Sequence, residues 1–404
     1  MLKCWPDQIM KSLDVCSVAL LVLLAGCSEK KQPVPENPFS AGPLKTTIGG
    51  EPAIALNRLP PASTDKPQLL KAVILPGRGM DIYQLQADVP GKGLVDVLAS
   101  PPLQEAEKLM NGDADDFNGN RNFQSGGAIL VPYANRIRGK YLPKSREIET
   151  TILGKTVKLP ANWRGKKPGA EWHAMHGLIL NRRFTNIETH ADSSSAVLTG
   201  TLEAGDFGGH WLSKTDLSFE AKLGTDNFEF TLTAKNAGDE TLPIGIGWHP
   251  YFALPSGNRD QARLYVPAAK RALANNYDDV FPTGKIEDVK GTPYDFSAAG
   301  GAPLDKLFLD DSFTDLQKQP GDATVIEIID PAAKYGVRIT AHSKQVHAVQ
   351  VYAPPDKSFV VVEPQFNLAD PFSKVWPKNV DTGMVKLAPG ESVTYSVSVA
   401  LFVP

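Results

Sequence analysis

The side chains best suited to chemistry in this sequence are a histidine and a glutamate that lie far apart in the chain. His249 stands in the aromatic run GWHPYF at residues 247–252, and Glu363 follows the apolar run FVVV at residues 359–362. A histidine can donate or accept a proton near neutral pH, and a positioned carboxylate can act as a base. Aromatic neighbours suit a sugar, because its ring faces present C–H groups and its edges present hydroxyls. Taken singly, a buried core histidine and a solvent-facing strand-end glutamate are the alternatives.

The segments that must position these residues have the pattern of β-strands. Apolar and polar residues alternate over residues 217–223, 228–234, 335–341 and 393–401, and each run predicts a strand with one buried face. Helix signals are scarce, and the best one covers residues 101–110. Many alternating runs separated by Gly, Pro and Asp predict an all-β fold, a large antiparallel β-sandwich with few short helices.

The two chemical segments, in this order, resemble the aldose 1-epimerase (galactose mutarotase) family. The acid histidine of that family lies in a His-x-Tyr-Phe motif, which His249, Tyr251 and Phe252 match, and its base glutamate lies in a late strand, as Glu363 does. The resemblance covers roughly residues 65–404 and implies a galactose mutarotase-like supersandwich with an open sugar cleft. It implies Glu363 as the base for the anomeric hydroxyl and His249 as the acid for the ring oxygen. No cofactor or metal is expected for this chemistry.

Further motifs occur in the order that the family has and imply residues that bind the sugar. NRI at residues 135–137 resembles an Asn-Arg-Ile element, and HG at 176–177 resembles a His-Gly-Gly element. LDDSF at 309–313 resembles a Leu-Asp-x-x-Phe segment, and VQVY at 349–352 holds a glutamine where family members place one near the base. The substrate-binding residues implied in this way are Asn135, Arg136, His176, Asp310 and Gln350.

Three of these assignments have alternatives. Asp305 fits the same spacing as Asp310 and is the alternate register. His173 and His176 form a His-x₂-His pair, which is weak evidence for zinc without a third nearby ligand, so a sugar contact is the preferred interpretation. Gln350 lies on an alternating segment and could equally be an outward-facing polar residue.

The sequence departs from the family pattern in ways that bear on the cleft. Leu178 stands where a second glycine is common, which puts the loop geometry in question, and Trp248 and Pro250 replace residues that are commonly polar and are expected to alter the cleft wall. The polar and aromatic segment at residues 155–175 is long. Such loops often lie over a site, so we expect this one to cap the cleft or to lengthen it toward an oligosaccharide or an acidic sugar.

The N-terminal residues have the composition of an export signal. Residues 17–26 form an uncharged apolar run that is too short to span a membrane, and LAGC at 24–27 resembles the bacterial lipobox. This resemblance implies that residues 1–26 are removed and that Cys27 carries the lipid; an ordinary cleaved signal peptide is the alternative. Ser28 after the cysteine favours a lipid anchor in the outer membrane, facing the periplasm.

The organisation expected from these patterns has three parts. Residues 1–26 are a lipoprotein signal peptide, residues 27–67 are a proline-rich tether, and residues 68–404 are the β-sandwich domain. The later part of the tether, with Ile54 and Leu56, has the residues to pair onto the domain.

The composition excludes some classes of partner. The 42 Lys and Arg residues against 45 Asp and Glu residues give a formal net charge of −3, which offers no electrostatic surface for nucleic acid. Cys4 and Cys16 lie in the expected signal peptide, so the remaining chain would keep only Cys27 and form no disulfide. The family resemblance implies a small sugar as partner, and the lipobox implies a membrane lipid; no protein partner can be inferred.

Three functions compete at this point. The leading hypothesis is an aldose 1-epimerase that acts on free aldohexoses. An epimerase of hexose 6-phosphates would need extra cations, which Arg182 with Arg183, or Arg164 with Lys166 and Lys167, could supply. A non-catalytic carbohydrate-binding lipoprotein on the same scaffold is the alternative from a different class.

Overall fold

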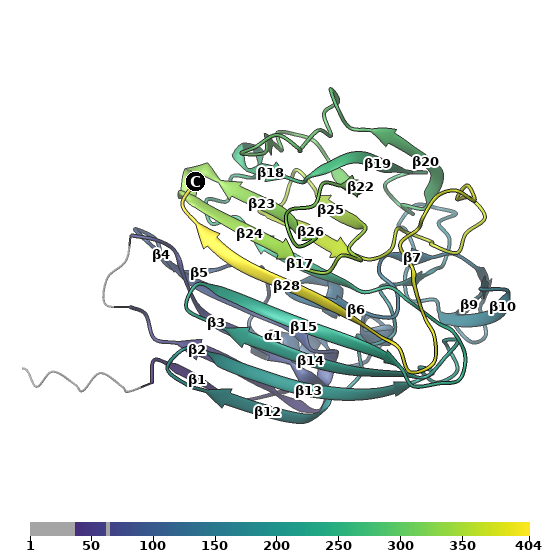
Figure 1. Ribbon diagram of the computed structural model, residues 1–404, viewed down its shortest axis with the longest axis horizontal. Helices are drawn as coiled ribbons and strands as arrows, with labels where there is room; N and C mark the ends of the chain where they lie inside the picture. Colours follow the sequence, from purple (N-terminus) through teal and green to yellow (C-terminus); the bar gives the residue numbers. More distant parts are fainter. Residues whose placement is uncertain (1–36, 62–64) are drawn as a thin grey trace, which may run out of the picture. The chain divides into compact units, whose positions relative to one another are not determined.

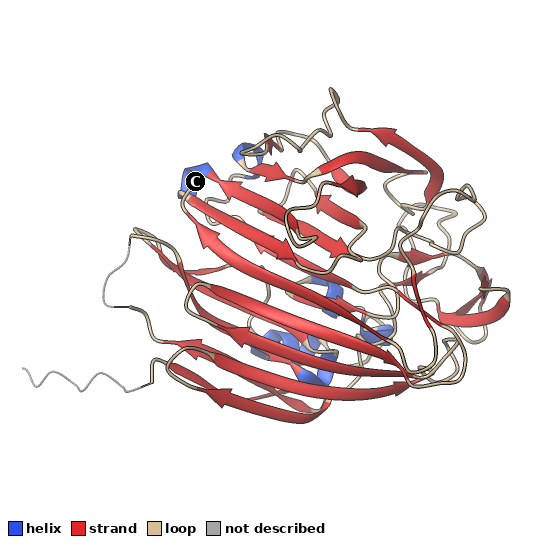
Figure 2. Ribbon diagram, viewed as in Figure 1, coloured by secondary structure: helices blue, strands red, loops and turns tan. Residues whose placement is uncertain are grey.

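Antiparallel strands build most of the described chain, and the helices are few and short (Figures 1 and 2). The computed structural model describes residues 37–61 and 65–404. The fold is the large antiparallel β-sandwich that the alternating sequence predicts. The predicted signal peptide and Cys27 lie outside the described residues.

The largest sheet has nine strands, all joined in antiparallel pairs, and most of them run side by side across the molecule in Figure 1. In spatial order they are β12 (Thr185–Ala191), β13 (Ala196–Gly205), β14 (Thr215–Leu223), β15 (Asn227–Asn236), β28 (Ser392–Phe402), β24 (Tyr335–Ala341), β23 (Thr324–Asp330), β18 (Arg263–Tyr265) and β21 (Ala302–Pro303). The four strands predicted from alternation are β14, β15, β24 and β28, and they are confirmed. In β15, Phe228, Phe230, Leu232 and Ala234 are all buried, because one face of the strand lies against the core.

The second sheet has seven strands and carries the candidate site. In spatial order they are β20 (Pro282–Asp288), β19 (Ala268–Ala274), β22 (Leu309–Leu316), β25 (Ala348–Ala353), β26 (Phe359–Gln365), β17 (Gly247–Ala253) and β6 (Gly127–Leu130). His249 lies on β17 and Glu363 lies on the neighbouring β26, so strand pairing joins the two distant motifs.

The third sheet has five strands and begins before the expected domain boundary. Its strands are β1 (Phe39–Ile48), β2 (Glu51–Arg58), β3 (Gln68–Leu75), β4 (Asp81–Val89) and β5 (Gly93–Asp96), in that order. Part of the tether expected over residues 27–67 is thus folded, since β1 and β2 belong to a compact unit of residues 37–404 and β2 pairs onto β3, as the residues of the later part of the tether allow. The physical reason is that Ile54 and Leu56 are buried in the core against β3, as their apolar side chains allow.

Smaller elements complete the fold. Three short sheets are formed by β8 (Lys140–Leu142), β9 (Glu147–Ile152) and β10 (Lys155–Pro160), by β7 (Arg136–Ile137) and β11 (Ala174–Met175), and by β16 (Leu242–Ile244) and β27 (Val385–Leu387). The helix predicted at residues 101–110 is α1 (Leu103–Leu109). Single 3₁₀ turns occupy Pro76–Arg78, Phe117–Gly119, Asn122–Gln124, Arg259–Gln261 and Pro331–Ala333. Within the described ranges, no helix is long and apolar enough to cross a membrane.

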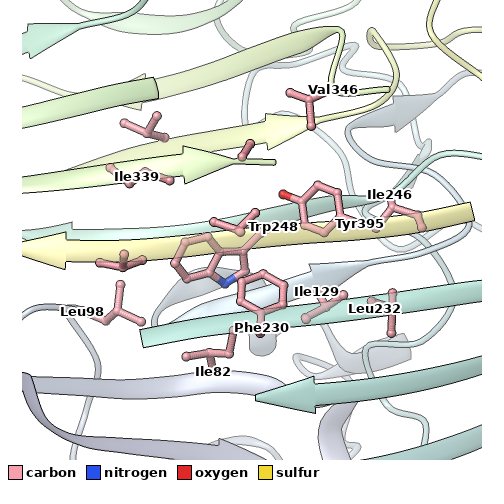
Figure 3. Packing of buried hydrophobic residues seen from close by; sticks show 14 of the residues in the cluster. Ile82, Leu98, Ile129, Phe230, Leu232, Ile246, Trp248, Ile339, Val346 and Tyr395 are labelled. Carbon is pink, nitrogen blue, oxygen red and sulfur yellow. The ribbon is translucent and has the colours of Figure 1, made fainter. Parts of the chain in front are cut away.

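One hydrophobic core joins residues from all three large sheets. Trp248 of β17 lies fully buried in it, with its ring centroid 5.2 Å from that of Phe230 on the nine-stranded sheet. Figure 3 shows the indole among Ile82, Ile129 and Phe230, which come from three different sheets. The indole N–H is satisfied, since it donates to the carbonyl oxygen of Gly127 at 2.9 Å. This contact couples the strand that carries His249 to the packing of the whole domain.

We expect the position of the first strand to decide where a stable chain can begin. A chain of residues 68–404 lacks β1 and β2 and exposes the core that Ile54 and Leu56 cover. Each large apolar side chain that is no longer buried lowers the free energy of unfolding by about 1.5–3 kcal/mol. Several such losses are comparable to the whole stability of a domain, about 5–15 kcal/mol. Thermal unfolding followed by circular dichroism should show a cooperative transition for residues 37–404 and a much lower one, or none, for residues 68–404. Equal midpoints for the two chains would contradict the boundary drawn here.

Candidate active site

A cavity of about 320 Å³ opens on the face of the seven-stranded sheet that points away from the core. Small-molecule sites are typically about 300–1,000 Å³, so the cavity has the size of a sugar site. Every catalytic and substrate-binding residue that the sequence suggested lines it: Asn135, Arg136, His176, His249, Asp310, Gln350 and Glu363. The structure thus gathers into one place residues that are spread over most of the described chain.

Strand alternation explains why these side chains share one face. Gln350 of β25 pairs with Glu363 of β26 and with Ser312 of β22, so the three stand side by side across neighbouring strands. Val360 and Val362 occupy the alternate positions of β26, so their side chains point the other way, into the core. The cavity face and the core face are therefore opposite faces of the same strands.

His249 and Glu363 form a buried pair at the base of the cavity. The Nε2 atom of His249 lies 3.4 Å from Oε1 of Glu363, and the two side chains are only 7% and 2% exposed. The other nitrogen of His249, Nδ1, and the other oxygen of Glu363, Oε2, are buried without a hydrogen-bond partner in the described part of the chain. Buried polar atoms without partners are rare in proteins, and at this cavity the hydroxyls of a ligand could supply the missing partners.

Burial also sets the proton affinities of this pair. It raises the pKa of Glu363 well above 4.5, to which the nearby Asp310 adds, while Arg136 acts in the opposite direction. Burial lowers the pKa of His249 to about 3. Burial thus favours the uncharged form of each group, a protonated carboxyl beside a neutral imidazole, with one proton to transfer between them.

A hydrogen-bonded network surrounds the amide of Gln350. Its nitrogen donates to Oδ1 of Asp310 at 2.7 Å, and its oxygen accepts from Nδ2 of Asn135 at 3.1 Å and from the hydroxyl of Ser312. Arg136 donates to Oδ1 of Asn135 at 2.9 Å and lies 3.6 Å from Asp310. The amide thus faces the cavity rather than solvent, and Asp310 and Asn135 are held in place through it. Ser312 carried no sequence signal of this role beyond its place in the strand.

The short sheet of β7 and β11 places the Asn-Arg and His-Gly elements side by side. Met175 pairs with Arg136, and the backbone N–H of His176 donates to the carbonyl of Asn135 at 2.9 Å. His176 and Asn135 have φ values of 60° and 62°, in the left-handed region that side chains rarely adopt. Such strain gathers at functional sites, because the surrounding structure must hold it. The His176 ring lies 4.8 Å from that of His249.

The departures from the family pattern leave the cleft intact. Leu178 is buried in the core and its N–H donates to the carbonyl of Val131 at 2.6 Å, while His176 still reaches the cavity. Trp248 and Pro250 do not line the cavity, so the expected change of the cleft wall is wrong. They alternate with His249 along β17 and therefore face away from the cavity.

The alternatives that the sequence left open, Asp305 and His173, lie outside the cavity lining. Asp305 is exposed and does not line the cavity, whereas Asp310 does. His173 is fully buried, its Nδ1 lies 3.0 Å from the carbonyl oxygen of Glu171, and its ring packs against the edge of Phe281. Within residues 37–61 and 65–404, no group of three or more His, Cys, Asp or Glu side chains could hold a metal ion.

The long segment at residues 155–175 does reach the cavity. Trp163, Arg164 and Lys166 line it. The backbone N–H groups of Lys166 and Lys167 donate to the carboxylate of Asp278 at 2.8 and 3.0 Å, which ties the segment to the loop after β19. The segment therefore forms one wall of the cleft.

The other candidate cations lie elsewhere. Arg183 pairs with Glu51 at 3.2 Å, and Arg182 donates to the carbonyl of Phe207 at 3.2 Å. Neither lines the cavity; of the cations considered for a phosphate, Arg164 and Lys166 do.

Aromatic side chains make up much of the remaining wall, and sequence reasoning did not assign them. They are Phe123, Trp163, Tyr251, Tyr277, Phe308 and Tyr352. Tyr251 belongs to the His-x-Tyr-Phe motif, which was the available signal, and its hydroxyl donates to the carbonyl of Phe123 at 3.0 Å. The others come from separate loops and strands, so no spacing in the chain connects them.

Known proteins resemble this chain in sequence and in fold. A protein-family model described as Aldose 1-epimerase matches residues 99–400. The uncharacterized protein YphB of Escherichia coli strain K12 is 27% identical over 281 residues, which cover 67% of this chain and 81% of that protein.

Solved structures share the fold at low sequence identity. A galactose mutarotase-like protein from Clostridium acetobutylicum has a TM-score of 0.67 at 18% identity, covering 91% of this chain and 99% of its own. A galactose 1-epimerase from Lactobacillus acidophilus has a TM-score of 0.59 at 16% identity, covering 90% and 98%. Because the family model covers most of the sequence and its strands build the cleft described above, this chain belongs to the aldose 1-epimerase family.

Proposed function

We propose that this protein is an aldose 1-epimerase that interconverts the α and β anomers of free aldohexoses. The observation that carries the proposal is the buried His249–Glu363 pair, 3.4 Å apart, with its unpartnered atoms at a sugar-sized cavity. Ring opening requires one group that accepts a proton and one that donates a proton, and this pair supplies both.

The reaction needs only proton transfers between the pair and the sugar. Moving the shared proton from Glu363 to His249 gives a carboxylate and an imidazolium, and Arg136 favours the carboxylate. Glu363 then accepts the proton of the C1 hydroxyl, and His249 delivers its proton to the ring oxygen as the C1–O5 bond breaks. Rotation about C1–C2 in the open aldehyde and the reverse steps give the other anomer. Each positioned proton transfer contributes about 10²–10⁴-fold to the rate.

The remaining polar side chains would hold the hydroxyls of the sugar. Arg136 offers a fixed fork of donors that stays charged, and Asp310 offers carboxylate oxygens as acceptors. Asn135 and Gln350 hold both of them in place through the network described above. His176, packed against His249, would contact the sugar near the ring oxygen.

One observation supports a second candidate, an epimerase of hexose 6-phosphates. Arg164 and Lys166 line the cavity, and both are cations that could bind a phosphate group. Both side chains are exposed at the rim, where charges are screened, so the free sugar remains the preferred substrate.

We expect Glu363→Gln to lower kcat for mutarotation of glucose or galactose by about 10²–10⁴-fold, because glutamine cannot accept the proton. The fold should persist. Burial raises the pKa of Glu363, so its ionisation destabilises the folded state as pH rises above 4.5, and a neutral glutamine avoids this loss. Polarimetry on freshly dissolved α-anomers measures the rate, and thermal unfolding at alkaline pH should give a midpoint no lower than that of the wild type.

Glu327→Gln is the matched control, since Glu327 lies on a strand, bonds Arg338 and does not line the cavity; its kcat should stay unchanged. Wild-type turnover in Glu363→Gln would remove Glu363 as the base. If glucose 6-phosphate competes much more strongly than glucose, the phosphate candidate replaces the free sugar. If the protein binds sugars but shows no mutarotation rate above that of the buffer, the alternative of a non-catalytic carbohydrate-binding protein is favoured.

The pH profile should reflect the shifted proton affinities. The pair gains a second proton only toward about pH 3, where His249 titrates, and it loses its last proton only above the raised pKa of Glu363. We therefore expect kcat, corrected for the buffer rate, not to fall on the acidic side as the pH drops through the ordinary histidine pKa of about 6.5, and to fall on the alkaline side above the raised pKa of Glu363. A half-loss of kcat near pH 6.5 on the acidic side would show instead that His249 titrates as an ordinary imidazole.

We also propose that Cys27 carries a lipid that anchors the protein at the periplasmic side of a bacterial membrane, with the outer membrane favoured. The support is the LAGC sequence at residues 24–27. Intact-mass measurement of membrane-extracted protein should give the mass of residues 27–404 plus acyl chains, and Cys27→Ala should block this processing. A soluble, unmodified protein that starts at another cleavage site would contradict the proposed lipid anchor but would not bear on the proposed reaction.

A further inference from the structure

A row of aromatic rings runs along the cavity and continues beyond it. Tyr277 lies 5.1 Å from Phe308, Phe308 lies 6.2 Å from Tyr352, and Tyr352 lies 6.3 Å from Phe359, measured between ring centroids. Phe359 in turn lies 5.0 Å from Tyr251. The first three residues and Tyr251 line the cavity of the catalytic pair, whereas Phe359 lines a different one.

The row leads to a second cavity of about 370 Å³ that adjoins the first. Gln124 and Tyr251 line both cavities, so these two side chains form their common border. The second cavity is also lined by Leu109 of α1 and by Phe359 of β26, which packs against Tyr251 at the border. One sugar ring with its hydroxyls needs only the first cavity, which holds all the groups assigned to the reaction.

The second cavity also has polar groups placed for a ligand. Arg121 lines it and donates through Nη1 to Oε1 of Gln124 at 3.0 Å and through Nη2 to Asp115 at 3.4 Å. Its Nε is buried without a hydrogen-bond partner among the described residues. Ser100 lines the same cavity. Ring faces with a few convergent polar groups are the surroundings that a sugar ring requires, while a purely aliphatic ligand would leave these donors unpaired.

We propose that the second cavity binds a second sugar ring, so that the preferred substrate is a reducing disaccharide or a longer reducing saccharide. The inference rests on the proposed function for its catalytic half. The ring beside His249 and Glu363 must keep its C1 hydroxyl free, because that hydroxyl is the one that loses its proton. The second ring is therefore attached through another oxygen of the first ring, past Gln124 and Tyr251.

The test compares glucose with disaccharides that have glucose at the reducing end: maltose, cellobiose, lactose and melibiose. Calorimetric titration gives affinities, and polarimetry gives kcat/KM. At least one of these disaccharides should exceed glucose about fivefold or more in both quantities, since an additional aromatic contact accompanies the second ring. If no disaccharide of the panel binds more tightly than glucose, the proposal is overturned. Binding is measured independently of turnover, so an inactive protein would refute the proposed reaction without deciding this test.

Two alanine variants make the matched comparison. Phe359→Ala removes a ring that lines only the second cavity, so the disaccharide-to-glucose ratio of affinities should fall toward one. Phe308→Ala removes a ring of the same row that lines only the first cavity, so it should weaken both ligands and leave the ratio unchanged. An unchanged ratio in Phe359→Ala overturns the proposal. Leu109→Ala, at a half-buried position of the second cavity, gives the same test if Phe359→Ala does not fold by circular dichroism.

Discussion

The pairing of β17 with β26 is the constraint on which the rest of this protein depends. The two strands bring His249 beside Glu363, and they do so while their opposite faces close the core. Trp248 and Val362, one residue from each catalytic candidate, lie fully buried among side chains of the other sheets. A one-residue shift of β17 would place the indole in the cavity, and a one-residue shift of β26 would place the carboxyl in the core. The packing of the core therefore fixes the register that the reaction needs.

The same burial that positions the pair makes it unfavourable to ionise. Glu363 has His249 as its near neighbour and an oxygen without a hydrogen-bond partner in the described chain, and His249 and His176 each keep an unpartnered nitrogen. Isolated polar atoms of this kind each destabilise a fold by about 1–3 kcal/mol. The extensive apolar core and the satisfied network around Gln350 offset this loss. Stability given up at a site in exchange for reactivity is a recurrent feature of enzymes.

The walls of the cleft have a different origin from its base. The base consists of alternating strand residues, whereas the walls come from Phe123, from the segment around Trp163, and from the loop that carries Tyr277. Arg271 and Tyr277 both bond the carboxylate of Asp311, the neighbour of Asp310. Wall and base are thus connected. In the function proposed above, the base would supply the proton transfers, and the walls with the adjoining second cavity would set the size of the saccharide.

The local sequence by itself determined the strands and the chemical nature of the site. Alternation in residues 217–223 or 335–341 reports a buried face wherever the strand goes, and the ordered motifs around Asn135, His176, Asp310 and Glu363 pointed to residues that line one cavity. The tertiary structure decided what depends on contacts between distant segments. Local composition gave residues 27–67 as a tether with some residues suited to pairing, and only the contact of β2 with β3 shows that β1 and β2 belong to the folded domain. Likewise, which face of β17 holds Trp248, the roles of Ser312 and the aromatic row, and the existence of a second cavity follow only from packing, since each joins residues that no spacing in the chain relates.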